Sequence, residues 1–223
     1  MKIGVLGGIG PESTGEFYNR LIKYLQNKKL VRANEDFPQI IVNSIPAPEL
    51  IYDKISDKEL KPYINGVKEL DRMGVDFIVI VCNTIHLYYD RLQKEVNAPI
   101  INLRQGIKEL LIKEKVNVCL VLGTANSIKY GLYKFEEIKT LEPNKKEVKQ
   151  IADLIFNYNK GIYTNKEIKN LKKVCLKYLN KGAKKIILGC TELVLMLEKE
   201  DLPKIDTIDV LVDLVIEKFL QIR

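Results

Sequence analysis

The chain has 223 residues, 46% hydrophobic and 29% charged, so it can bury the core of one large domain or of two small α/β lobes. Its formal charge of +7 comes from scattered lysines, without the basic stripe and interleaved aromatic residues that mark a nucleic-acid partner. It has no run of about 20 apolar residues, so the sequence predicts no membrane span.

The chain opens, at residues 1–4, directly in an apolar strand pattern. This start lacks the basic segment, apolar run and cleavage site of a signal peptide, so we expect a cytoplasmic protein. The four cysteines are too few and too dispersed for a disulfide framework, which is in any case rare in that compartment.

Short runs rich in valine and isoleucine are each followed by a helical pattern. Strands that alternate with helices predict parallel sheets covered on both faces, and continuous apolar runs are typical of strands buried on both sides. The predicted strands, in chain order, are residues 3–6, 40–42, 77–81, 118–122 and 186–188.

A glycine-rich loop at residues 4–14 follows the first strand and precedes a helix. Glycines in that position permit close backbone approach and leave N–H groups for an anion, so we predict a small-anion cradle around Gly10. The spacing differs from the G-x-G-x-x-G of dinucleotide sites, and the second strand ends without the acidic residue that would hold a ribose. A tight turn with no ligand is the alternative interpretation.

The chain also repeats itself. In both copies a helix ends at a glycine, a strand follows, and a cysteine, Cys82 or Cys190, stands where the strand stops. The matching segments are 2–8 with 117–123, 73–84 with 181–192, and 98–101 with 202–205.

This duplication predicts two similar α/β lobes related by a pseudo-twofold, with lobe one at residues 1–100 plus 206–223 and lobe two at residues 101–205. Ligands of open α/β sheets bind beyond the carboxyl ends of the strands. We therefore expect an active site in a cleft between the lobes, with Cys82 and Cys190 on opposite sides.

Two facing thiols suit inversion of a carbon centre, which needs a base on one face and an acid on the other. A free thiol has a pKa of about 8.5, and the N–H groups of a strand-to-helix turn lower it toward the working pH. Cys119, in mid-strand, and Cys175, on an apolar helix face, are interpreted as packing residues.

Polar neighbours of these cysteines are candidate substrate ligands. Asn83, Thr84 and Thr191, with the nearby N–H groups, are expected to hold a carboxylate and the charge that develops on it. The single histidine, His86, either tunes Cys82 or binds a carboxylate, or else caps or packs. Glu192 either orients an ammonium group or a proton carrier, or suits a helix N-terminus. One histidine and no Cys-x-x-Cys spacing predict no metal site.

Together these residues resemble the aspartate/glutamate racemase family. The segments that carry the resemblance are 7–14, 81–86, 122–124 and 188–193, in the family's order. The resemblance implies a racemase without pyridoxal phosphate, metal or other cofactor. It also implies Cys82 and Cys190 as acid and base, a small anionic amino acid as substrate, Thr124 among the carboxylate ligands, and commonly a homodimer.

Glu192 after Gly-Cys-Thr, where glutamate racemases typically carry histidine, resembles the aspartate racemase branch. In that branch a lysine upstream of the second cysteine holds a substrate carboxylate, and Lys160 matches this role. A basic residue near the second strand has no counterpart, since residues 45–49 contain neither arginine nor lysine. This absence favours a broader amino-acid specificity.

Two alternatives share these features. One is a related isomerase, acting on a hydantoin or on a dicarboxylate such as maleate. The other is a non-enzymatic binder of an acidic metabolite, which gives no reason for a cysteine in both repeats.

Overall fold

The computed structural model describes residues 1–222, so residue 223, the last of the expected lobe one, lies outside the described part. The chain divides into two compact units. The first contains Met1–Pro48, Ile55–Leu103 and the chain from Ile208 onward, and the second contains Glu49–Lys54 and Arg104–Thr207.

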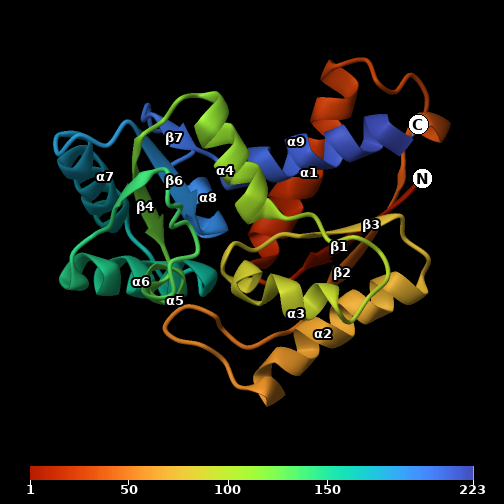
Figure 1. The fold of residues 1–223 in the computed structure, drawn as a ribbon, viewed down its shortest axis with the longest axis horizontal. Coiled ribbons are helices and arrows are strands. Elements are labelled where there is room, and N and C mark those ends of the chain that lie inside the picture. Colours follow the sequence, from red (N-terminus) through yellow and green to blue (C-terminus); the bar gives the residue numbers. More distant parts are fainter. Residues whose placement is uncertain (223) are drawn as a thin grey trace. The chain divides into compact units, whose positions relative to one another are not determined.

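The first unit is built on a parallel three-stranded sheet in the order β2-β1-β3, with β1 in the centre (Figure 1). The strands are β1 (Lys2–Gly7), β2 (Gln39–Ser44) and β3 (Phe77–Ile80). The helical segments are α1 (Pro11–Asn27), η1 (Asn34–Asp36), α2 (Asp57–Arg72), η2 (Thr84–Tyr88), α3 (Tyr89–Gln93) and α9 (Thr207–Ile222).

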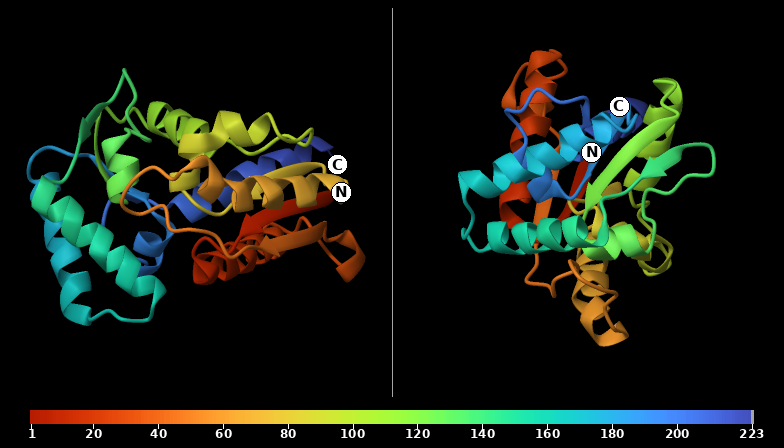
Figure 2. Two further views of the ribbon diagram at one scale, coloured as in Figure 1. Left: turned by 90° about the horizontal axis from the view of Figure 1, so that it is seen from below. Right: turned by 90° about the vertical axis from the view of Figure 1, so that its left-hand side faces the viewer.

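Helices cover both faces of this sheet. Successive residues of a strand point to opposite faces, so the contacts of Gly4 and Gly7 in β1 report what lies on each face. A methyl group added at Gly4 would meet Leu70 of α2, whereas one added at Gly7 would meet Thr14 of α1. The helices α1 and α2 accordingly lie on opposite sides of β1 (Figure 2, left). β1 and β3 are buried as expected, but β2 is an edge strand whose Val42 is exposed.

The second unit is built on a parallel four-stranded sheet in the order β5-β4-β6-β7. Its strands are β4 (Val118–Gly123), β5 (Lys139–Leu141), β6 (Lys185–Gly189) and β7 (Lys204–Ile205). Its helices are α4 (Leu103–Lys113), α5 (Ala125–Lys129), α6 (Lys145–Asn159), α7 (Asn165–Leu179) and α8 (Thr191–Met196).

The two sheets repeat one pattern. The central strand β4 is flanked by β5 and β6 as β1 is flanked by β2 and β3. The proline segments correspond as well: Ile78 N–H donates to the Pro99 carbonyl, and Ile186 N–H donates to the Pro203 carbonyl, both at 2.9 Å. The prediction of two α/β halves with parallel sheets is confirmed.

The units depart from the expected boundaries at three places: residues 101–103 belong to the first unit, and residues 206–207 and 49–54 belong to the second. Residues 49–54 were expected in lobe one, but they belong to the second unit. Asn126 in α5 holds them there: its side-chain amide donates to the carbonyls of Leu50 (3.1 Å) and Asp53 (2.9 Å), and its backbone N–H donates to Ile51 (3.0 Å).

Within the described residues, no helix is both long enough and apolar enough to cross a membrane.

Candidate active site

Cys82 lies two residues beyond the end of β3, at the carboxyl edge of the first sheet. Its side chain is 8% exposed, and Asn83 and Thr84, which follow it, are almost completely buried. Asn83 is the N-cap of η2, and its carbonyl accepts the backbone N–H of His86 at 3.0 Å. The expected strand-to-helix turn is present, and the helix that follows it is the short 3₁₀ helix η2.

His86 is directed at carbonyl groups. Its Nδ1 lies 2.8 Å from the Cys82 carbonyl and its Nε2 lies 3.4 Å from the Ile101 carbonyl. Burial lowers the pKa of His86, so the ring is neutral at neutral pH and carries one N–H. The ring also stacks on Tyr89. Of the roles open from the sequence, this geometry favours packing that fixes the backbone of Cys82.

Cys190 occupies the equivalent place in the second unit, where β6 ends and α8 begins. It is the N-cap of α8, with extended backbone, and its side chain is 6% exposed. Its Sγ donates a hydrogen bond to Glu192 Oε2 at 2.7 Å, and the Thr191 hydroxyl donates to the same oxygen at 3.3 Å. Of the roles that the sequence leaves open for Glu192, this contact favours that of a partner to a proton carrier, here the Cys190 thiol.

Glu192 is 4% exposed. Desolvation by burial raises the pKa of its carboxyl group, although hydrogen bonds from Cys190, Asn159 and Thr191 favour the charged form. Burial thus makes the protonated form of this carboxyl group more favourable than it is in water, directly beside a thiol.

The glycine loop of the first unit is a close-packed turn. Gly8 has φ +83°, and a methyl group there would lie 2.5 Å from the Ile45 carbonyl oxygen, so a side chain is excluded. The Gly8 N–H donates to the Thr14 hydroxyl at 3.1 Å, which in turn donates to the Gly10 carbonyl at 3.2 Å. The Gly8 N–H is thus engaged inside the loop, which supports the tight-turn interpretation. The anion cradle around Gly10 stays a prediction.

Thr124 caps α5. Its Oγ1 accepts the backbone N–H of Ser127 and donates to the Ser127 hydroxyl, both at 3.0 Å. This structural role accounts for its hydroxyl-bearing side chain at the end of β4. Its expected contact with substrate stays a prediction.

Lys160 ends α6 and is exposed, with its Nζ 3.7 Å from the centre of the Phe156 ring. Glu49, in the segment held by Asn126, lies within electrostatic reach of Lys160 and of Glu192. Sequence reasoning missed Glu49 and also Asn159, which hydrogen-bonds Glu192. Only an isolated charge in the apolar, proline-rich stretch 45–51 marks Glu49 in the sequence.

The other two cysteines are packing residues, as expected. Cys119 and Cys175 are fully buried. Desolvation raises the pKa of the Cys119 thiol to about 11 and that of Cys175 to about 12, so neither forms a thiolate at neutral pH.

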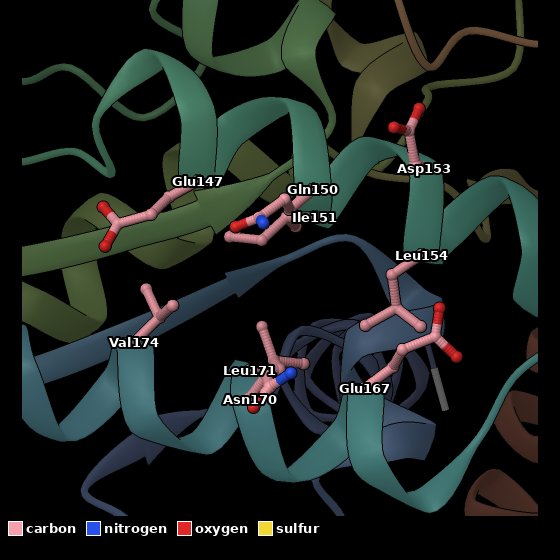
Figure 3. A pocket seen from close by; sticks show the side chains of 9 residues that line it. All are labelled: Glu147, Gln150, Ile151, Asp153, Leu154, Glu167, Asn170, Leu171 and Val174. Carbon is pink, nitrogen blue, oxygen red and sulfur yellow. The ribbon is translucent and has the colours of Figure 1, made fainter.

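A hollow of about 490 Å³ lies between α6 and α7 of the second unit (Figure 3). Its acidic groups are already engaged: Glu147 binds Lys177 and Tyr178, Glu167 caps α7, and Asp153 accepts the Tyr52 hydroxyl. The hollow carries no thiol, so we do not assign the chemistry to it.

Across residues 1–222, no three histidine, cysteine, aspartate or glutamate side chains are grouped so that they could hold a metal ion.

Comparison with known proteins identifies the family. A sequence profile of the Asp/Glu/Hydantoin racemase family matches residues 6–215. The chain belongs to this family. The resemblance inferred from the cysteine and glycine motifs is thereby confirmed.

Curated relatives of this racemase family match parts of the chain. The broad specificity amino-acid racemase RacX of Bacillus subtilis (strain 168) is 34% identical over 148 residues, which are 66% of this chain and 63% of that protein. The glutamate racemase of Aquifex pyrophilus is 43% identical over 68 residues, or 29% of this chain and 27% of its own length. The matches thus span less than two thirds of these relatives.

Solved structures match nearly the whole chain. An aspartate racemase homologue from Pyrococcus horikoshii OT3 superposes with a TM-score of 0.73 and 28% identity, covering 97% of this chain and 98% of that one. The aspartate racemase of Picrophilus torridus gives a TM-score of 0.78 at 23% identity, with 97% and 93% covered, a likeness that concerns the fold alone.

Proposed function

We propose that the protein is a cofactor-independent amino-acid racemase in which Cys82 and Cys190 are the two acid–base groups. The observation that carries the proposal is the equivalent placement of the two thiols. Each follows the strand that pairs with the central strand of its own sheet, β3 beside β1 and β6 beside β4. Membership of the racemase family supports the reaction class.

The chemistry is a proton exchange at the α-carbon. One cysteine, as thiolate, takes the Cα proton and becomes a thiol, which leaves a carbanion conjugated with the α-carboxylate. The other cysteine, as thiol, delivers its own proton to the opposite face and becomes a thiolate. The product is the mirror-image amino acid, and the enzyme is left ready for the reverse reaction.

Glu192 assists Cys190 in this proposal as a positioning residue. Its carboxyl group contacts the thiol directly, and burial raises its pKa, which favours the protonated form. When Cys190 becomes a thiolate, a protonated Glu192 donates a hydrogen bond to it and stabilises the charge.

The charge that develops on the substrate carboxylate needs hydrogen-bond donors. We assign this role to the side chains of Asn83, Thr84 and Thr191, which follow the two cysteines along the chain. The four free thiols also fit a reducing, cytoplasmic setting, which is part of the same proposal.

The test is racemisation measured by chiral chromatography over a panel of L- and D-amino acids, with a hydantoin and maleate included. The protein is first treated with EDTA and with hydroxylamine, which trap metals and pyridoxal phosphate. We expect turnover to survive this treatment and to be lost in Cys82→Ala, while Cys119→Ala, a packing control, retains it. Turnover of only the hydantoin or maleate, or full activity of Cys82→Ala, would overturn the proposal.

A further inference from the structure

The ring of His86, the only histidine of the chain, is enclosed between two backbone segments of the first unit. Its side chain is 5% exposed. On one side Nδ1 lies 2.8 Å from the Cys82 carbonyl oxygen, and on the other Nε2 lies 3.4 Å from the Ile101 carbonyl oxygen. The ring of Tyr89 lies nearly parallel to it, with the ring centres 6.4 Å apart. The imidazole therefore has little freedom to turn.

The segment on the far side of the ring is itself fixed to the sheet. The Ile101 N–H donates to the Ile78 carbonyl at 2.8 Å, and the Ile78 N–H donates to the Pro99 carbonyl at 2.9 Å. The Tyr89 hydroxyl donates to the Ile100 carbonyl at 3.1 Å. Since Ile78 belongs to β3, these bonds set the place of the imidazole relative to the strand that leads to the first thiol.

The two distances determine which ring nitrogen carries the proton. Burial lowers the pKa of His86, so the ring is neutral and has one donor and one acceptor nitrogen. If Nε2 carried the proton, the lone pair of Nδ1 would face the Cys82 carbonyl oxygen at 2.8 Å, where two acceptors repel. With the proton on Nδ1, the same distance is that of an ordinary N–H···O hydrogen bond. The geometry therefore makes Nδ1–H the donor to Cys82.

We propose that His86 is a positioning residue whose Nδ1–H bond to the Cys82 carbonyl holds the Cys82 thiol where it exchanges a proton with the substrate α-carbon. The inference rests on the proposed racemase function and deepens it. The bond is made to the backbone of the residue that carries the sulfur, so a turn of this carbonyl also moves Sγ. Rates of such reactions depend steeply on the placement of the reacting atoms. Cys190 differs, since its partner Glu192 contacts the sulfur itself.

Three substitutions separate the Nδ1–H bond from packing. His86→Phe keeps a ring beside Tyr89 and removes both nitrogens, whereas the amide nitrogen of His86→Asn can replace Nδ1 and that of His86→Gln can replace Nε2. We expect kcat of racemisation to fall by about tenfold in His86→Phe and His86→Gln with KM within about twofold, as loss of one buried hydrogen bond implies. His86→Asn should stay within about threefold of the wild-type kcat, because it restores the bond.

Isotope effects distinguish a misplaced thiol from a loss of folded protein. Unfolding lowers every rate and leaves isotope effects unchanged. With Cα-deuterated L and D substrates, the isotope effect on kcat of His86→Phe should rise only in the direction in which Cys82 takes the Cα proton. The matched control is Lys2→Met, which removes a 2.8 Å bond from a side chain to the Met73 carbonyl at the amino end of β1. It should keep the wild-type kcat and isotope effects.

A second measurement needs no variant. Because the chain has one histidine, protein labelled with ¹⁵N-histidine gives the ring-nitrogen NMR signals of His86 alone. We expect the neutral Nδ1–H form at pH 8. An Nε2–H ring, a His86→Asn variant as slow as His86→Phe, or recovery by His86→Gln instead would overturn the inference while the racemase proposal stands. If the wild-type protein racemises no amino acid, the proposed function is wrong and the inference falls with it.

Discussion

Replacing Glu192 by glutamine tests how the buried carboxyl group serves Cys190. The two side chains have nearly the same shape, so the packing around α8 is retained. The amide can still donate a hydrogen bond to sulfur, but it cannot hold or release a proton. The variant therefore removes the proton-sharing role and keeps the contact.

The expected magnitude follows from the contact in the structure. The bond from Cys190 Sγ to Glu192 Oε2 is a hydrogen bond to an ionisable group in a buried place, at 2.7 Å. Such bonds are worth about 1.5–3 kcal/mol, and the neutral bond that the amide retains is worth about 0.5–1.5 kcal/mol. The exchange should therefore cost about 1–1.5 kcal/mol and lower kcat by about 5- to 13-fold. Because enantiomers have equal free energies, kcat/KM must fall by the same factor for the L and D substrates.

The assay is the initial rate of racemisation in both directions from pH 5 to pH 10, with Glu217→Gln, an exposed acid on α9, as the control. We expect the pH profile of kcat for Glu192→Gln to lose one ionisation that the wild-type and control proteins show. In parallel, the alkylation rate of Cys190 should change its pH dependence. An unchanged kcat and an unchanged pH profile would refute the assigned role, as would a loss explained wholly by unfolding.

Three further predictions follow from the same geometry. The pKa of Glu192 is raised above its ordinary value of 4.5, so the folded state binds more protons than the unfolded state. The free energy of unfolding should therefore decline as the pH rises above about 4.5 and through the raised pKa. Urea titrations of the wild-type protein and Glu192→Gln should therefore diverge over that range, and parallel curves would contradict it. Gly8→Ala places a methyl 2.5 Å from the Ile45 carbonyl at positive φ and should cost more than about 2 kcal/mol, whereas Gly15→Ala, with nothing within 4 Å in α1, should gain up to about 1 kcal/mol. Maleimide at pH 8 should modify the two strand-end thiols before the two packed thiols, read by peptide mass, and the reverse order would refute the assignment. The strand-end thiols are Cys82 and Cys190, and the packed thiols are Cys119 and Cys175.

Much of the fold is legible in the sequence because its central strands are buried on both faces. Their valine and isoleucine runs predict β1, β3, β4 and β6 to within two residues at either end. β5 was missed because its three residues, Lys139–Leu141, mix polarity and form a sheet edge. Such a strand is defined by its pairing with β4, and the residues of β5 alone give no pattern that predicts this pairing.

The site was predictable where chemistry and position coincide along the chain. Cys82 and Cys190 and the polar residues after them each follow a predicted strand. The internal repeat is therefore enough to predict them as site residues. The atom-level roles were not predictable: the spacing placed His86 near Cys82, but only the structure directs the ring to the carbonyl. Glu49 is adjacent to β2 in sequence and joins the second unit through three bonds from Asn126, a tertiary fact that the chain order conceals.

The most direct test of the two-thiol mechanism is the location of deuterium at Cα during the first turnovers in D₂O, starting in turn from each pure enantiomer. The mechanism predicts that the newly formed enantiomer carries solvent deuterium while the recovered substrate still carries protium, in both directions. Deuterium entering substrate and product equally from the start, or protium retained in the product, would show that a single group moves the proton and would contradict the account.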